Sequence, residues 1–391
     1  MKQKLLAAAA VAGGLVFAIA FGSYLVISSN SRPLHADVNN IPSVIGGAPS
    51  PKWSDAVKRA EQIARTGVKE QNLPGLSAAV GAAGDIVWAE GFGWTNIVSR
   101  DLVDSDTTFR IGHVSVPLTA AAVGVLRERG RINLDYDIQE YVPAFPKKEW
   151  PVTVRQLMGN TSGIHHYRDT EWGDKPSTHC ERAADGLPVF ANDPLLFQPE
   201  TQYRYSTYGW TLVSAAVEAI AGEPFFEFMR TNVFQPLGMT HTSAETAGAR
   251  NSATSYYRGN FGSEITTNVD YSCFAGGGAF LSSPSDLVRF GLAMTSGTFL
   301  HADTLKLLQT RQVLSSGTTT DYGLGWNLET DELGGRKERA IFHSSRTMEG
   351  ASTTLLAFPD SGLVIAVSAN MSFADMKAMS LAIAQAFNLS R

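Results

Sequence analysis

Strand-forming segments lie at both ends of the globular part of this sequence, and this arrangement most restricts how the chain can fold. Near the beginning, Leu76–Val80 and Ile86–Glu90 are short apolar runs separated by a glycine-containing turn. Near the end, Ala351–Phe358 and Leu363–Ala369 form a second pair around a Pro-Asp-Ser-Gly turn. Two such pairs, so far apart in the sequence, indicate one antiparallel sheet assembled from both ends of the chain.

Helical patterns flank and separate these strands. Apolar residues recur at helical spacing in Ser54–Gln71, before the first strand, and in Phe373–Phe387, after the last. Between about residues 116 and 264 the pattern is mostly helical. The sequence therefore predicts an α+β domain over residues 52–391, with an antiparallel sheet flanked by terminal helices and a mostly helical region inserted at about 116–264.

Residues 1–30 resemble a membrane anchor or a signal peptide. Lys2 and Lys4 precede an uncharged segment from Leu5 to Asn30, which is long enough to span a bilayer as a helix. The basic start predicts a cytoplasmic N-terminus and an exported domain. Because Ala18–Ala20 also fits a signal-peptide cleavage pattern, the domain is expected either tethered at the periplasmic face of the inner membrane or secreted.

The next segment, residues 31–51, is rich in Pro, Asn, Gly and Ser and has no periodicity, which predicts a linker. The net charge of −5, with no run of Lys or Arg, argues against a nucleic-acid partner. Cys180 and Cys273 lack the paired spacing of a zinc site. In an exported domain they form either one disulfide or two buried thiols.

Several short motifs occur in order along the domain. They are Phe109–Gly112 before a helix, Leu134–Asp135 after it, Asn160–Ile164, Tyr205–Gly209, Pro236–Met239 and Ala275–Gly278. In this order they resemble the motifs of penicillin-recognising serine hydrolases of the class C β-lactamase type. The Tyr-Ser-Thr sequence of the fourth motif is especially similar to that of the mitochondrial serine β-lactamase-like proteins and their bacterial relatives.

The resemblance implies a catalytic scheme with three motifs. A Ser-x-x-Lys motif opens the helix after Phe-Arg-Ile-Gly, so that the lysine lies one turn beyond the serine and accepts its proton. A tyrosine from Tyr-x-Asn or Tyr-Ser-Thr relays protons. A Lys-Thr-Gly or His-x-Gly strand lines the cleft, and a backbone N–H beside it completes an oxyanion hole with that of the serine.

This chain departs from the first motif at both chemical positions, because His113 and Val116 stand where the family has serine and lysine. A shifted alignment does not restore the motif. Ser115 is followed three residues later by Leu118, and it points away from the helix face of His113.

The other two motifs are partly kept. Tyr205 holds the tyrosine position, and His343 begins the third motif, where Ser345 replaces the glycine. A side chain at position 345 is expected to intrude on a substrate lying along the strand. Arg346 matches the residue whose backbone N–H would serve the oxyanion hole. We therefore assign Val116, Ser345 and Arg346 to the ligand-binding side of the cleft.

Loss of the nucleophile alone costs roughly 10⁶ in the turnover of such hydrolases, so acyl-serine hydrolysis is expected to be absent. The first hypothesis is a binding protein whose cleft still accepts a small-molecule or peptide ligand. The second is an enzyme in which His113, Tyr205 and His343 perform acid/base chemistry on esters or amides. The helix N-terminus would keep His113 neutral, as a base requires.

A metal site is a third hypothesis, built from His113 and His343 with His165 or His166. The i, i+4 spacing and the acidic partner of a metallohydrolase are missing from the sequence. We therefore expect neither a metal nor a cofactor.

Overall fold

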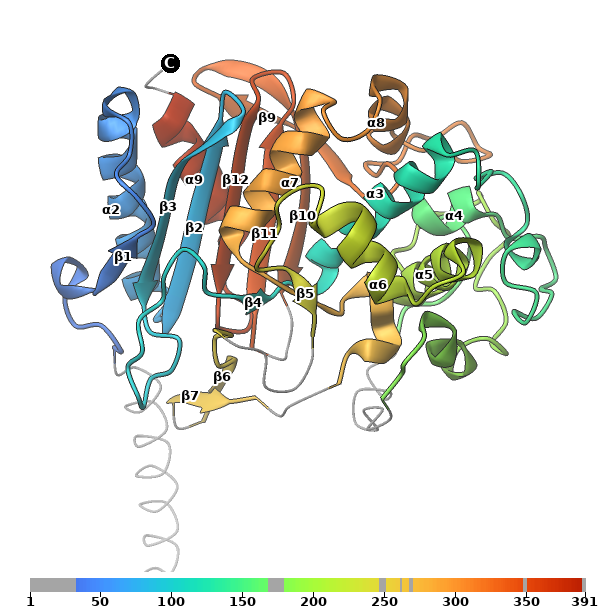
Figure 1. Cartoon of the computed structure of the whole chain (residues 1–391), viewed down its shortest axis with the longest axis horizontal. Coiled ribbons are helices and arrows are strands. Elements are labelled where there is room, and N and C mark those ends of the chain that lie inside the picture. The colour runs from blue at the N-terminus through green and yellow to red at the C-terminus, as the bar shows by residue number, and fades with distance from the viewer. Residues whose placement is uncertain are drawn as a thin grey trace, which may run out of the picture.

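The computed structural model describes residues 33–167, 179–245, 251–260, 262–266, 270–346 and 350–388. Its main feature is a seven-stranded antiparallel sheet in the order β1-β3-β2-β12-β11-β10-β9 (Figure 1). The strands are β1 (Ser43–Ile45), β2 (Gly75–Ala82), β3 (Asp85–Gly93), β9 (Asn327–Leu333), β10 (Arg336–Arg346), β11 (Ser352–Phe358) and β12 (Leu363–Ala369).

The two ends of the chain meet at the centre of this sheet. Strand β12 pairs with β2 in a register that places Ala369 opposite Leu76 and Val364 opposite Gly81. The remaining neighbours in the sheet are also antiparallel. The prediction of one antiparallel sheet built from both ends of the domain is thus confirmed.

Helices cover both faces of the sheet. Helices α2 (Ser54–Glu70) and α9 (Met376–Asn388) pack together on one face, and α7 (Pro284–Ser296) packs on the other (Figure 1). Alternate residues of β12 enter the two resulting cores, with Ile365 on the α2/α9 side and Val364 on the α7 side. Burial on both faces explains why β12 is apolar at six of its seven positions and does not alternate with polar residues.

The inserted region surrounds helix α3 (Ser115–Glu128), whose residues from Ser115 to Leu126 are all buried. The other helices there are α4 (Val154–Met158), α5 (Thr207–Ala221), α6 (Phe225–Met229) with the π-helix Arg230–Phe234, and α8 (Ala302–Leu308). Two small sheets accompany them, formed by β4 (Phe109–Arg110), β8 (Phe280–Ser282) and β5 (Ser243–Ala244), and by β6 (Tyr256–Gly259) and β7 (Gly262–Ile265).

Short 3₁₀ helices complete the architecture: η1 (Val38–Asn40), η2 (Pro51–Trp53), η3 (Gly112–Val114), η4 (Ile138–Glu140), η6 (Ala183–Val189) and η8 (Ser272–Gly277). Two of them, η3 and η8, form the walls of the candidate site described below. Together with the sheet and the helices, they give the α+β architecture that the sequence predicts.

The linker prediction for residues 31–51 is wrong for much of its length. Strand β1 pairs with β3, with Val44 opposite Gly91. Ile41 is buried in the core under α2, and His35 stacks on Trp94 with ring centroids 4.3 Å apart. Three paired residues are too few for an alternating pattern, so the sequence contains no strand signal here.

The predicted leader, residues 1–30, lies outside the described residues. Within the described ranges, no helix has the length and apolar character needed to cross a membrane.

A disulfide joins Cys180 to Cys273, which decides between the two states left open for these cysteines. The bridge connects the segment before η6 to η8 and closes a loop with a sequence separation of 93. Beside it, the backbone N–H of Cys180 donates to Ser272 Oγ at 2.8 Å. The bridge therefore fixes the position of η8.

We expect replacement of both cysteines by serine to lower the free energy of unfolding by about 2–5 kcal/mol, because the unfolded chain regains the entropy of a long open loop. Urea denaturation of the oxidised proteins measures this difference. A reducing agent should destabilise the parent protein but leave the double variant unchanged. A double variant as stable as the oxidised parent would contradict this account.

Candidate active site

Three predicted site residues come together from three different parts of the fold. His113 lies in η3, between β4 and the start of α3, Tyr205 precedes α5, and His343 lies on β10. The ring centroids of His113 and Tyr205 are 5.2 Å apart, and those of Tyr205 and His343 are 6.1 Å apart. The structure thus places all three at the junction between the sheet and the helical region.

The imidazole of His113 is paired with a neutral hydroxyl. Its Nε2 lies 3.2 Å from Thr207 Oγ1, and the two atoms share a hydrogen bond. Burial lowers the pKa of His113 from its usual 6.5 to about 4. The ring is therefore uncharged above this pH, and its hydroxyl partner does not strengthen it as a base in the way a carboxylate would.

The backbone N–H of His113 donates to Ser345 Oγ at 3.1 Å. By the family resemblance, this N–H occupies the place of an oxyanion-hole donor. Ser345 lies on β10, is buried, and replaces the family's glycine. The Ser345 hydroxyl thus accepts the hydrogen bond of the backbone N–H that, by the resemblance, an oxyanion would need.

The side chains of the other two residues assigned to ligand binding are not available to a ligand. Val116 has no exposed surface and belongs to the hydrophobic core, so its side chain offers a ligand no surface to contact. The Arg346 guanidinium turns toward the start of α9, where it donates to the Ala374 carbonyl and lies 3.8 Å from Asp375. Only the backbone N–H of Arg346 remains as the predicted contribution.

Ser115 does not provide an alternative nucleophile. Its side chain is completely buried, and its Oγ forms no hydrogen bond with any described residue. Residue 118, three positions further along the helix, is leucine, so no lysine is placed to accept a proton from Ser115.

Two polar atoms beside His113 have no partner of normal geometry among the described residues. They are the hydroxyl of Tyr205 and Nδ1 of His343, both buried. The other nitrogen of His343, Nε2, lies 3.4 Å from the Tyr322 hydroxyl. Buried polar atoms of this kind are rare, and each costs about 1–3 kcal/mol when it stays unpaired.

Burial also keeps these groups uncharged. It raises the pKa of Tyr205 well above 10, with Tyr167 and Tyr203 adding to the effect. Burial and then the neighbouring His113 lower the pKa of His343 to about 3. Tyr205 is therefore a protonated phenol and His343 a neutral imidazole near pH 7, and both can form hydrogen bonds without carrying charge.

A third histidine, which the sequence analysis considered only as a metal ligand, belongs to the same cluster. His166 accepts a hydrogen bond from the Thr207 backbone N–H at 3.2 Å, and its ring centroid is 6.0 Å from that of His113. Burial and then His113 lower its pKa to about 3. His165 instead faces away and lies 2.7 Å from Asp193.

The metal hypothesis finds no support in this cluster. Across the ranges that the structure describes, no three His, Cys, Asp or Glu residues are grouped so that they could hold a metal ion.

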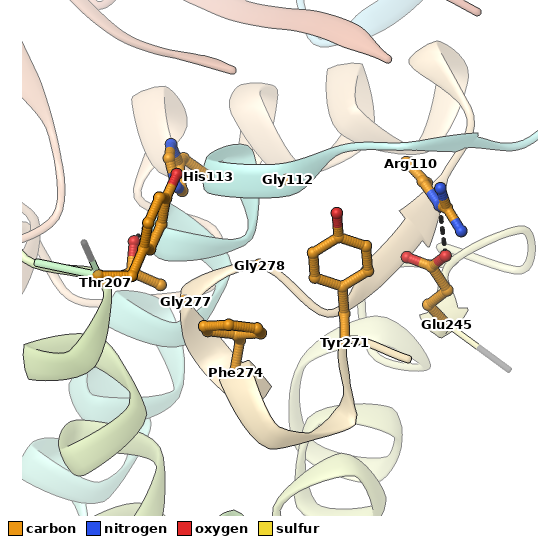
Figure 2. A pocket seen from close by; sticks show the side chains of 10 residues that line it. Arg110, Gly112, His113, Thr207, Glu245, Tyr271, Phe274, Gly277 and Gly278 are labelled. Atoms are coloured by element: carbon orange, nitrogen blue, oxygen red, sulfur yellow. Dashed lines mark hydrogen bonds and ion pairs between the residues drawn. The ribbon is translucent and has the colours of Figure 1, made fainter. Parts of the chain in front are cut away.

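A small cavity of about 30 Å³ opens beside His113 (Figure 2). This is room for roughly two water molecules. Its walls include Tyr271, which immediately precedes η8, Phe274 from η8, and the Arg110–Glu245 ion pair at its far side. Figure 2 shows both aromatic rings lying between His113 and that ion pair. A larger ligand therefore requires these side chains to move.

The sequence analysis did not identify these wall residues. Arg110 and the glycines of η8 lie within motifs that it recognised, but their position beside the cavity follows from the fold alone. Tyr271, Phe274 and Glu245 have no sequence signal of their own.

Comparison with known proteins places this architecture in context. Residues 60–387 match the family model described as Beta-lactamase. The chain is 27% identical to the serine beta-lactamase-like protein LACTB, mitochondrial, of Bos taurus, over 82% of this chain and 77% of that protein. It is 26% identical to penicillin-binding protein 4* of Bacillus subtilis (strain 168), over 75% of this chain and 67% of that protein.

Among solved structures, the chain resembles EstCE1, described as a hydrolase with promiscuous acyltransferase activity. The TM-score is 0.74 at 19% identity, covering 87% of this chain and 100% of that one. An octameric penicillin-binding protein homologue from Pyrococcus abyssi gives a TM-score of 0.74 at 22% identity, over 86% and 78%. Both likenesses concern the fold. The match of residues 60–387 to the family model shows that this chain belongs to the β-lactamase family.

Proposed function

We propose that this protein binds acyl or peptide ligands in the family's cleft and does not hydrolyse them through an acyl-serine intermediate. The hydrogen bond from the His113 backbone N–H to Ser345 Oγ carries this proposal. It occupies a donor that would have to stabilise an oxyanion. His113 supplies no hydroxyl nucleophile, and Val116 supplies no proton acceptor.

The unpaired polar atoms favour an uncharged carbonyl as the bound group. The Tyr205 hydroxyl is a protonated donor, and His343 is a neutral imidazole. Neither offers the positive charge that a carboxylate would prefer, and Arg110 at the far wall is already paired with Glu245. An amide or ester carbonyl would accept a hydrogen bond from Tyr205, and its binding would not require a charged group to lose its hydration.

The names of similar proteins agree with this ligand class. A D-amino acid amidase from Ochrobactrum anthropi SV3, solved with phenylalanine amide, has the same fold, with a TM-score of 0.71 at 21% identity. Its printed ligand contains an amide carbonyl. We propose that the ligand of this chain has the same kind of group.

We further propose that the domain acts outside the cytoplasm. The support is the uncharged stretch from Leu5 to Asn30 behind Lys2 and Lys4. An uncleaved anchor of this length would keep the domain beside the membrane.

Binding without turnover can be tested with an N-acetyl dipeptide amide and with penicillin G. Calorimetry should detect binding, and mass spectrometry should recover both compounds intact. Tyr205→Phe should weaken binding roughly fivefold, as expected for one lost hydrogen bond. Hydrolysis products that depend on the folded protein would contradict the proposal.

Restoring the missing groups should create an acyl-enzyme. His113→Ser with Val116→Lys places a nucleophile and a base one helical turn apart, and burial should lower the pKa of the lysine so that it can accept a proton. Ser345→Gly should then release the backbone donor at position 113. The triple variant should form a fluorophosphonate or penicillin adduct on the serine introduced at position 113, seen by intact and peptide mass spectrometry.

The parent protein and the single variants should remain unlabelled, since nucleophile and base act as a unit. Labelling of the parent protein on any serine would refute the assignment of the site. A folded triple variant that reacts with none of these probes would show that the cleft has diverged beyond the three substituted positions.

The rival hypothesis, in which His113 is a general base, makes a different prediction about pH. The basic form of His113 accumulates as the pH rises through about 4, so its catalysis would give a rate that climbs near pH 4 and then levels off. An unperturbed histidine would place this rise near pH 6.5. Burial of His113 thus moves the expected rise in rate from near pH 6.5 to near pH 4.

We expect no such rise with an activated aryl ester, and identical rates for the parent protein and His113→Ala. His301→Ala, which removes an exposed histidine, is the matched control. A rise near pH 4 that disappears only in His113→Ala would favour the enzyme over the binding protein.

A further inference from the structure

The β6–β7 hairpin lies at the lower end of the molecule as drawn in Figure 1, and large apolar side chains are exposed on it and on the segments that it contacts. Among them, Val98 is 83% exposed, Ile265 60% and Phe373 59%. We call this surface the apolar end, and it comprises Val98, Leu102, Tyr257, Ile265 and Phe373. Single exposed apolar residues are common on soluble proteins, so these five residues are significant only if they are neighbours.

One buried residue, Tyr256, ties the three segments of the apolar end together. Its hydroxyl accepts a hydrogen bond from the backbone N–H of Ile97, beside Val98. Ile265 lies directly opposite Tyr256 in the β6–β7 hairpin. The carbonyl of Tyr256 accepts from the N–H of Ser372, the residue before Phe373. Val98, Ile265 and Phe373 thus belong to segments in direct contact.

The backbone at Phe373 is in a conformation that disfavours a large side chain. Its φ is 58°, in the left-handed region that glycine and asparagine usually occupy. Phe373 therefore combines a strained backbone with a hydrophobic ring that is exposed to solvent. Contact with an apolar phase would offset the cost of exposing the ring.

The chain enters the described fold at this same end. The backbone N–H of Leu34 donates to Asn72 Oδ1 at 2.7 Å, and His35 stacks on Trp94. Trp94 begins the segment that contains Val98 and Leu102, and it pairs with Leu102 in an isolated bridge. The first described residue, Pro33, therefore lies beside the apolar end.

Charged side chains of both signs border the apolar residues, with the carboxylates of Asp101 and Glu264 beside two arginines. The guanidinium of Arg100 lies 5.3 Å from the Trp94 ring, and Arg258 donates to the Gln71 carbonyl at 2.6 Å. Both residues are exposed. Aromatic and aliphatic side chains bordered by arginine are typical of surfaces at the boundary between lipid headgroups and acyl chains.

We propose that the apolar end rests on the surface of a lipid bilayer, with the Val98, Ile265 and Phe373 side chains in the headgroup region. This inference rests on the membrane-anchored location proposed above. The contacts of Leu34 and His35 leave little chain between the anchor and the domain, so the bilayer is the apolar phase that the apolar end meets first. The contact would fix the orientation of the domain, which a flexible tether would not.

The test uses the full chain in vesicles of phosphatidylcholine with a minority of phosphatidylglycerol. Because both native cysteines are bridged, a single introduced cysteine can carry an environment-sensitive dye. Val98→Cys, Ile265→Cys and Phe373→Cys probe the apolar end. Val313→Cys is the control, because Val313 is 59% exposed, like Phe373, but lies beside the β-bridge partner Thr319, away from the apolar end.

At the three positions of the apolar end we expect a blue shift of the dye emission and its quenching by lipids that carry a nitroxide near the headgroup. The dye at position 313 should keep its aqueous spectrum and remain unquenched. A blue shift without quenching by lipid would instead indicate contact with a second copy of the chain, and would overturn the proposal.

Unquenched dyes at all four positions, in a chain that remains bound to the vesicles, would overturn the proposed contact alone. A chain that does not associate with the vesicles would overturn both the contact and the anchored location. The binding of ligands by the domain is measured separately and does not depend on either result.

Discussion

The pairing of β2 with β12 is the constraint on which the rest of the structure depends. It joins residues 76–81 to residues 364–369 across nearly the whole domain, and neither hairpin can bury both of its faces without the other. Once the two hairpins are joined, β10 and β11 extend the sheet to the point where η3 begins helix α3. The contact between His113 and Ser345 across this junction is therefore a product of long-range pairing and not of local sequence.

The parts of the fold that the sequence predicts are those in which burial dictates the pattern. Helix α2 and strand β12 match their predicted ranges closely, because one is amphipathic and the other is buried on both faces. The sequence does not predict strands β9 and β10, since β9 contains Glu329, Asp331 and Glu332 and β10 begins with four consecutive charged residues, 336–339. On an edge strand the solvent-exposed residues are free to be charged, and the apolar signal is diluted.

The residues of the candidate site also differ in whether they could be predicted from the sequence. His113, Tyr205 and His343 could be assigned to one cleft only through the family resemblance, because no spacing rule connects residues so far apart. His166 could not be recognised from the sequence as a member of the site, because its role depends on Thr207. His166 accepts a hydrogen bond from the Thr207 backbone N–H, and the Thr207 side chain shares a hydrogen bond with His113. The walls formed by Tyr271 and Phe274 depend on η8, which the disulfide to Cys180 holds in place. Such contacts exist only after folding.

Some polar atoms of the site have a hydrogen-bond partner within the described part of the protein and others have none there, and this difference bears on the function of the site. The backbone donor of His113, which hydrolysis would need free, is paired within the protein, whereas the Tyr205 hydroxyl and His343 Nδ1 remain unpaired among the described residues. These two observations together support the proposed role in ligand binding.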